Sequence, residues 1–508
     1  MPRRILALDQ GTTGSAALVF DERLRVKATA DQEFVQRFPK PGWVEHDPED
    51  IWRTTLAVAK RALRASKTRR PDALGVTNQR ETVVAWDART SKPLCRAIVW
   101  QDRRTADRCD ALRAEGREAW LRDRTGLVLD PYFSATKMEW MLRNVPKVQQ
   151  AAKAGTLRFG TVDAWLAWRL TGGATHATDA SNASRTLLYD LDRRDWSPEL
   201  LELFGVPREA LPDVVSSSGP IGLTSVETLG AEVPITGMAG DQQAALFGQA
   251  CFDPGEAKNT YGTGSFLLMN TGDKRPASPR LLATVAWETG GRVEYALEGG
   301  IFTTGASVQW LRDGLGLVET AAETERIARS VKDAGGVRFL PALAGLGAPH
   351  WDAHARGAFV GLTRGTTAAH LVRAVLEATA YRSAEVAQAM EEDSGVRLRA
   401  LRVDGGGSMN GFLMQFQADL LGVPVERPRV SETTALGAAC LAGLGAGVFR
   451  SRDDVRKAWT LSKRFTPRMT DDERRMRRAE WSAFVRAARA LYAETTVAHG
   501  LASSRKGA

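Results

Sequence analysis

The chain has 508 residues, more than one ordinary domain holds, so two large domains are expected. Its 43% hydrophobic and 25% charged content is typical of a soluble protein with a sizeable core. No apolar run approaches the roughly 20 residues that cross a bilayer, and residues 1–9 are too short and too soon acidic for a signal peptide. We therefore expect neither membrane insertion nor secretion.

The cysteines are scattered along the chain and form no CxxC pair: Cys95, Cys109, Cys251 and Cys440. No histidine cluster at zinc spacing accompanies them. We expect small core residues in a reducing compartment, the cytoplasm, and neither a disulfide frame nor a metal site.

A net charge of +9 raises the question of a nucleic-acid partner. The basic residues are mostly arginines spread over the whole chain, with an excess in residues 450–489. There a capping box (TDDE, residues 470–473) starts a helix whose basic residues alternate with apolar ones. Because no recognition motif accompanies this charge, we expect a solvated helix face and no nucleic-acid partner. Residues 491–508 are expected to form a disordered tail.

Short apolar runs alternate with helical patterns along the chain. Strands are predicted at residues 4–8, 16–20 and 83–86, and helices at residues 49–66, 162–170 and 368–390. Strands interleaved with helices favour an α/β fold.

One supersecondary pattern occurs twice. A strand, a turn rich in glycine and threonine, and a second strand follow one another in residues 5–20 and again in residues 257–270. The repeat suggests two similar halves, which we assign to residues 1–250 and 251–490.

The two turns, residues 9–15 (DQGTTGS) and 261–265 (YGTGS), have the composition of a phosphate-binding loop. Glycine lets backbone N–H groups approach an anion closely, and threonine hydroxyls add further donors. Each turn alone could equally be an ordinary β-hairpin loop. Together they favour a nucleotide held between two lobes, without the Walker motif of a P-loop enzyme.

Two carboxylates and one ion pair stand beside these turns or at strand ends. Asp9 could organise Mg²⁺ through water, or it could cap its own turn. Asp241 lies between an apolar run and a predicted helix at residues 242–248, where it could serve as a base or as a helix N-cap. Arg80 and Glu81 could bind neighbouring hydroxyl groups, or form an exposed ion pair.

Motifs in a fixed order carry a family resemblance. They are residues 8–13 (LDQGTT), 42–48 (GWVEHDP), 77–82 (TNQRET), 99–105 (VWQDRRT), 130–137 (DPYFSATK), 239–243 (AGDQQ), 261–264 (YGTG), 305–310 (GASVQW), 345–349 (GLGAP) and 403–406 (VDGG). Over residues 4–490 the chain resembles the FGGY family of carbohydrate kinases, whose two signatures fit residues 132–144 and 357–377.

The resemblance implies a fold and an activity. The fold would be α/β, with two duplicated actin/hexokinase-like (ribonuclease H-like) domains and an active-site cleft between them. Among family members the motifs are most similar to those that phosphorylate glycerol. The implied reaction is transfer from ATP, with Mg²⁺, to give sn-glycerol 3-phosphate and ADP in glycerol catabolism.

The resemblance also assigns roles to residues. Asp241 would be the catalytic base, and Asp9 would organise the metal. Glycerol would be bound by Arg80, Glu81, Trp100, Tyr132, Asp241, Gln242 and Phe266. The nucleotide would be bound by Gly11, Thr12, Thr13, Gly14, Thr263, Gly264, Gly305, Gln309, Gly406 and Asn410.

One departure from the family pattern concerns the phosphates. Close relatives carry arginine where this chain has Ala16, and serine where it has Gly14. A pentulose or another polyol as acceptor, and a non-catalytic nucleotide-binding protein, remain the alternatives. Assembly into a homo-oligomer is possible.

Overall fold

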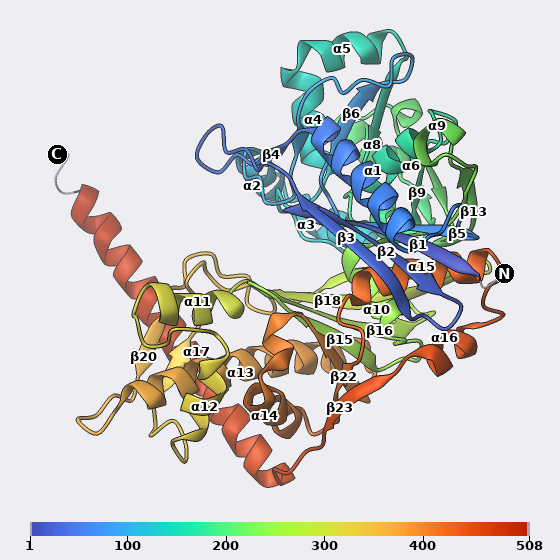
Figure 1. The fold of residues 1–508 in the computed structure, drawn as a ribbon. Helices are drawn as coiled ribbons and strands as arrows, with labels where there is room; N and C mark the ends of the chain where they lie inside the picture. Colours follow the sequence, from blue (N-terminus) through green and yellow to red (C-terminus); the bar gives the residue numbers. More distant parts are fainter. Residues whose placement is uncertain (1–2, 505–508) are drawn as a thin grey trace.

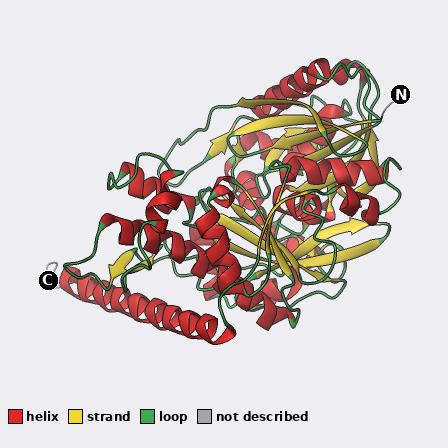
Figure 2. Cartoon of the chain, turned by 60° about the horizontal axis from the view of Figure 1, so that its bottom comes forward, coloured by secondary structure: helices red, strands yellow, loops and turns green. Residues whose placement is uncertain are grey.

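The computed structural model describes residues 3–504, which form an α/β protein built around one mixed sheet (Figure 1). The sheet has 13 strands in the order β23-β22-β21-β15-β16-β18-β17-β13-β14-β5-β1-β2-β3. Helices pack on both of its faces (Figure 2).

The sheet consists of two halves with the same design. The N-terminal half contains β1 (Arg4–Gln10), β2 (Gly14–Asp21), β3 (Val26–Glu33), β5 (Ala73–Asn78), β13 (Ser218–Leu223) and β14 (Pro234–Gly240). The C-terminal half contains β15 (Glu256–Tyr261), β16 (Ser265–Gly272), β17 (Leu282–Thr289), β18 (Arg292–Ile301), β21 (Ala400–Asp404), β22 (Val425–Pro428) and β23 (Leu461–Phe465).

Five strands of each half correspond in order and direction. In the series β14-β5-β1-β2-β3 the first two pairings are parallel and the last two antiparallel. The series β22-β21-β15-β16-β18 repeats this pattern. The duplication expected from the sequence is therefore confirmed.

The two halves meet at a narrow junction. β13 pairs with β17 through a single residue pair, Ser218 with Thr289. Two helices, α10 (Asp241–Gly248) and α15 (Thr433–Gly445), pack against each other between the halves (Figure 1). α15 also packs on β14, β5 and β1, so a late segment of the chain covers the N-terminal half. The division at residue 250 stays a prediction.

The helices that cover the sheet follow the apolar periodicity of their sequences. α1 (Pro48–Ala65) packs on β2 and β3, and its N-cap Asp47 accepts the backbone N–H of Glu49. In the C-terminal half, α13 (Ala368–Ser394) contacts β16 and β18 and packs against α14 (Gly411–Leu421).

A long insertion separates β5 from β14. It includes β6 (Val84–Asp87), β8 (Leu157–Gly160), α4 (Ala135–Asn144), α6 (Val162–Leu170) and α7 (Ala180–Ala183), and it belongs to the upper lobe of Figure 1. Several predicted site residues lie in this insertion.

The local predictions agree with the structure to within a few residues. The helix predicted at residues 162–170 is α6, and the helix predicted from residue 368 extends to Ser394. α17 (Asp471–Ser504) continues as a helix where a disordered tail is expected, and residues 505–508 lie outside the described part. Among residues 3–504, no helix has the length and apolar character that crossing a membrane requires.

Candidate functional site

The first predicted phosphate loop is the tight hairpin between β1 and β2. Its strands pair as far as Gln10 and Ser15, and Gly11 donates its backbone N–H to the carbonyl of Gly14 at 2.9 Å. Thr13 is exposed at the tip. The structure thus brings Gly11, Thr12, Thr13 and Gly14 together in one short loop.

The second loop repeats this geometry between β15 and β16. Tyr261 pairs with Ser265, and Gly262 donates to the carbonyl of Gly264 at 2.9 Å. Thr263 is exposed at its tip. Thr263 and Gly264 therefore occupy in the C-terminal half the place of Thr12–Gly14 in the N-terminal half.

The start of α11 (Gly305–Asp313) is fastened to the second loop. The backbone N–H groups of Thr304 and Ala306 both donate to the carbonyl of Thr263 at 3.0 Å. A side chain at Gly305 would overlap the carbonyl oxygen of Gly262, so only glycine allows this approach. Gln309 lies one turn along the same helix and is exposed.

Gly406 begins a 3₁₀ turn (Gly406–Met409) just beyond β21, and Asn410 is the C-cap residue that follows this turn. This turn packs against the second loop, since a side chain at Gly407 would contact Tyr261. Gly406 is exposed, whereas the amide of Asn410 accepts from Leu413 N–H and donates to Thr324. The predicted nucleotide residues of the C-terminal half are therefore neighbours.

The turn after β5 buries Arg80 and Glu81. Glu81 has φ +61, a left-handed conformation that a non-glycine residue rarely adopts and that is frequent at functional sites. Both side chains are almost fully buried, with 2% and 1% exposure. The alternative of an exposed ion pair is therefore wrong.

Asp241 begins α10, directly after β14. The N-cap is Gly240, so Asp241 stands at the first helical position and the N-cap alternative is wrong by one residue. Its Oδ1 lies 3.2 Å from Nε of Arg80, and its side chain is 29% exposed. Asp241 is thus held by an arginine and still open to a substrate.

Two of the predicted glycerol contacts are aromatic residues that pack together. Trp100 and Tyr132 meet edge to face with ring centroids 5.4 Å apart. The indole Nε1–H of Trp100 donates to Thr12 Oγ1 at 2.9 Å, which links the acceptor residues to the first phosphate loop. Burial raises the pKa of Tyr132, so its hydroxyl stays protonated.

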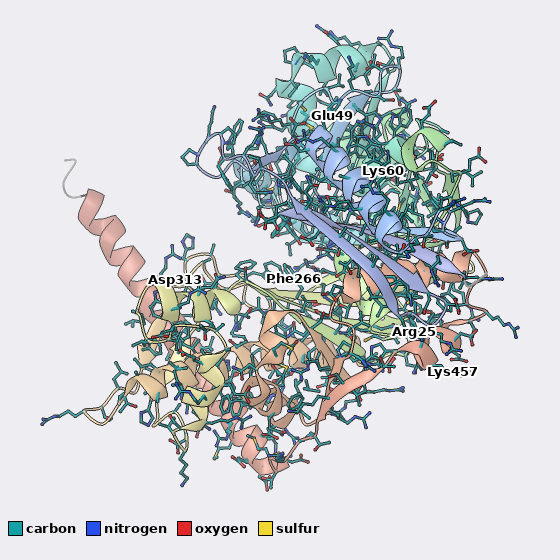
Figure 3. All side chains as sticks on the ribbon, viewed as in Figure 1. Arg25, Glu49, Lys60, Phe266, Asp313 and Lys457 are labelled. Atoms are coloured by element: carbon teal, nitrogen blue, oxygen red, sulfur yellow. The ribbon has the colours of Figure 1, made fainter. Side chains whose placement is uncertain are left out.

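Phe266 comes from the other half of the molecule. It is half-buried on β16, and in Figure 3 it lies on the side of the C-terminal half that faces the upper lobe. Phe266 is therefore placed to contact a substrate from the C-terminal half.

Asp9 lies at the end of β1, between Asp241 and the first loop. Burial, and after it the negative charge of Asp241, raises the pKa of Asp9 to about 7. Two carboxylates that oppose each other's ionisation suit a divalent cation. Mg²⁺ takes one or two carboxylates and completes its shell with water and substrate phosphates, so this pair fits it. Within the described residues no cluster of three such ligands exists.

Three buried charges near the site were missed by sequence reasoning. Gln242 Oε1 accepts a hydrogen bond from Nζ of Lys258, and Arg80 and Glu81 contact Glu298 and Arg185. A charged residue inside an apolar strand, as in residues 296–299 (ALEG), is the signal that could have revealed Glu298.

Ala16 lines a hollow on the N-terminal half. The hollow has a volume of about 240 Å³ beside the first loop, and its far wall includes Asp31 and Glu33 on β3. None of the described residues that line this hollow is a lysine or an arginine. The loss of a phosphate donor that the resemblance implies at Ala16 is therefore not offset by a cation in this wall.

Comparison with known proteins agrees with this arrangement. The model of the N-terminal domain of the FGGY family of carbohydrate kinases matches residues 4–248, and that of the C-terminal domain matches residues 257–446. Glycerol kinase 2 of Thermotoga maritima is 55% identical over 484 residues, covering 95% of this chain and 98% of the relative.

Two further comparisons point to the same group of proteins. A glycerol kinase of Deinococcus radiodurans is 57% identical, covering 96% of this chain and 97% of its own. The crystal structure of Plasmodium falciparum glycerol kinase with ADP superposes with a TM-score of 0.92 at 36% identity, covering 96% and 98% of the two chains.

Proposed function

Since the chain belongs to the FGGY family of carbohydrate kinases, we propose that it transfers a phosphoryl group from ATP to glycerol, giving sn-glycerol 3-phosphate and ADP. The observation that carries this proposal is the position of Asp241, whose carboxylate is held by Arg80 and remains 29% exposed. A carboxylate so placed can take a proton from a bound hydroxyl group.

In this reaction the protein positions the reactants and removes one proton. Arg80 and Glu81 bind two hydroxyl groups of glycerol, while the rings of Trp100 and Phe266 cover its carbon chain. The remaining hydroxyl oxygen attacks the γ-phosphorus as its proton passes to Asp241. The bond from the γ-phosphorus to the bridging oxygen breaks, and ADP leaves.

The nucleotide lies across both halves in this proposal. Backbone N–H groups and hydroxyls of the two loops bind the phosphates, and the segment from Gly406 to Asn410 borders the adenosine. Asp9 would hold Mg²⁺, which would neutralise charge on the transferred group. Closing the two halves over the substrates would exclude water as a competing acceptor.

Several finer expectations belong to this proposal. They are the magnesium ion, the cytoplasm as location, glycerol and ATP as the partners in place of a nucleic acid, and assembly of a homo-oligomer. The domain limits of residues 1–250 and 251–490 belong here as well.

An acceptor assay tests the proposal. Protein with Mg-ATP is offered glycerol, erythritol, xylulose or no acceptor, and ADP release is measured. We expect release that depends on glycerol; turnover only with the sugar would favour the pentulose alternative. No ADP release with any acceptor would favour a non-catalytic nucleotide-binding protein.

Asp241→Asn tests the base. Removing a general base lowers kcat by about 10²- to 10⁴-fold, because the amide cannot accept the hydroxyl proton. We expect this loss while the dissociation constant of ADP, measured by calorimetry, stays within about twofold. A variant with the kcat of the wild type would rule out Asp241 as the base.

A further inference from the structure

Four buried charges form a closed network behind the acceptor site. Arg80 and Arg185 alternate with Glu81 and Glu298, and their side chains are at most 2% exposed. We propose that Glu298 and Arg185 are positioning residues for the acceptor, which hold Arg80 and Glu81 so that an unpaired N–H and a carboxylate oxygen face glycerol. This inference rests on the proposed function.

Glu298 binds Arg80 through both oxygens. Its Oε2 accepts from Nη1 of Arg80 at 2.5 Å, and its Oε1 accepts from Nη2 at 2.9 Å. Such a two-point contact fixes the plane of a guanidinium group as well as its position. Burial alone would raise the pKa of Glu298, but Arg185 and Arg80 hold it down to about 2, so the clamp is ionised.

The contact with Glu298 limits which N–H groups of Arg80 are left to bind a substrate. Nη1 also donates to Gln243 at 3.1 Å, and Nε lies 3.2 Å from Oδ1 of Asp241 as an ion pair. A guanidinium group has five N–H bonds, and three of those of Arg80 donate to Glu298 and Gln243, which leaves Nε–H and one N–H on Nη2 without a hydrogen-bond acceptor among the described residues. Nε–H faces Asp241, and the N–H on Nη2 is left for a substrate hydroxyl.

Arg185 holds the carboxylate of Glu81 in place through one hydrogen bond. Its Nε donates to Oε1 of Glu81 at 2.7 Å, and its Nη2 donates to Oε1 of Glu298 at 3.0 Å. Nη1 of Arg185 is buried without a hydrogen-bond partner among the described residues. The guanidinium carbon also lies 5.7 Å from the ring centroid of Tyr132, another predicted glycerol contact.

The network joins three separate parts of the fold. Arg80 and Glu81 follow β5, Arg185 follows α7 in the insertion, and Glu298 comes from β18 in the C-terminal half. A buried ion pair is weak support for stability, because desolvation offsets most of the attraction. Fixing the orientation of two substrate-binding side chains is a role that an apolar replacement could not fill.

Loss of the clamp should also affect the base. Without Glu298, the guanidinium of Arg80 keeps only Glu81 and Asp241 as carboxylate partners. It would then turn toward Asp241 and occupy the oxygen that must take the glycerol proton. The expected loss therefore appears in kcat as well as in the KM for glycerol.

Glu298→Gln tests this with a matched control. Glu426→Gln removes another buried carboxylate from a strand, paired with Arg402 and 7% exposed, that contacts no predicted site residue. We expect Glu298→Gln to lower kcat/KM for glycerol by about 100-fold or more. The KM for ATP and the slow ATP hydrolysis without acceptor should stay within about twofold, and Glu426→Gln should leave all three unchanged.

Two further variants separate positioning from folding. Glu298→Asp keeps the charge and should recover part of the loss. Arg185→Lys keeps a cation but not the planar fork, and should raise the KM for glycerol about tenfold without changing the KM for ATP. If Glu298→Gln does not fold, Arg185→Lys alone decides the matter.

The outcomes distinguish this inference from the proposed function. A wild-type protein without glycerol-dependent ADP release would overturn the proposed function. With an active wild type, the inference is overturned if Glu298→Gln keeps kcat/KM for glycerol within threefold. It is equally overturned if glycerol turnover and acceptor-free hydrolysis fall by the same factor.

Discussion

Lys137 is a buried cation whose partners are all backbone carbonyls. Its Nζ donates to the oxygens of Pro131, Tyr132 and Phe133 at 2.5, 2.7 and 2.9 Å. Three consecutive carbonyls on one ammonium group fix the backbone that carries the Tyr132 side chain. At the same loop, Ser134 donates its hydroxyl to the carbonyl of Glu81 at 3.0 Å. A single lysine thus connects the folding of the insertion to the acceptor site.

Lys137→Met is therefore expected to raise the KM for glycerol about tenfold and to leave the KM for ATP unchanged. Lys153→Met, at an exposed lysine on α5 (Pro146–Lys153), is the matched control and should change neither constant. If Lys137 acts through Tyr132, the effects of Lys137→Met and Tyr132→Phe will not add in the double variant. Additive effects would contradict this role.

The pH dependence of the same variant provides a second check. Burial lowers the pKa of Lys137 to about 8, so the native side chain loses its proton above pH 8, while the unfolded side chain keeps it to about 10.5. The native state then gains stability relative to the unfolded state between these values. However, a neutral amine has only two N–H groups for three carbonyls.

We accordingly expect the wild-type KM for glycerol to rise above pH 8, and Lys137→Met to lack this component. Burial also lowers the pKa of Lys258, beside Gln242, to about 8, but Lys258 is present in both proteins. The difference between the two pH profiles therefore isolates Lys137. Identical profiles would contradict the assignment.

Some site residues can be predicted from the sequence and others cannot, for a physical reason. Arg80, Glu81 and Asp241 stand in short motifs at strand ends, where local sequence and family pattern coincide. Glu298 and Arg80 are 218 positions apart, and their contact exists only once β18 and β5 belong to one sheet. Such a contact leaves no local pattern, and only the unusual charge within β18 marks it.

At the scale of elements, the same distinction applies. Each Gly/Thr hairpin is predictable because two apolar strands and the turn between them are contiguous in sequence. The placement of α15 is not, since its apolar surface shows only that the helix is buried. The structure packs it on β14, β5 and β1, in the half of the sheet that the early part of the chain forms.

The contact between α10 and α15 depends on one glycine. A side chain at Gly437 of α15 would overlap the backbone carbonyl oxygen of Ala244 on α10. Replacing glycine by alanine in a helix ordinarily increases stability by up to about 1 kcal/mol. Here the helices would have to separate, and α10 carries Asp241 at its first residue.

Gly437→Ala should therefore lower the thermal unfolding midpoint by about 5 °C and reduce kcat. The comparison is Gly365→Ala, at a loop glycine whose nearest neighbour for a new side chain is Thr363 at 3.7 Å. That variant should leave both quantities unchanged. Calorimetry and the glycerol assay measure them, and an increase in the midpoint of Gly437→Ala would refute the close packing.

At the scale of the whole molecule, the predicted substrate sites lie between two halves whose sheets meet at one residue pair. The half-sheets share the single pair of Ser218 and Thr289, and the two predicted phosphate loops stand on opposite halves. The acceptor residues are divided in the same way, since Arg80 and Tyr132 lie between β5 and β14 of the N-terminal half, whereas Phe266 lies on β16 of the C-terminal half. Each substrate would therefore favour the arrangement that the other requires.

This division predicts positive coupling between the two binding sites. A saturating non-hydrolysable ATP analogue should lower the dissociation constant of glycerol at least about fivefold, and glycerol should lower that of the analogue by the same factor. Titration calorimetry in both orders measures the two factors. Phe266→Ala removes the ring through which the C-terminal half would contact glycerol. In that variant the factor by which the analogue lowers the dissociation constant of glycerol should fall toward one. Equal glycerol affinity with and without the analogue in the wild type would show that the halves bind their substrates independently, and closure would then not be what excludes water from the transfer.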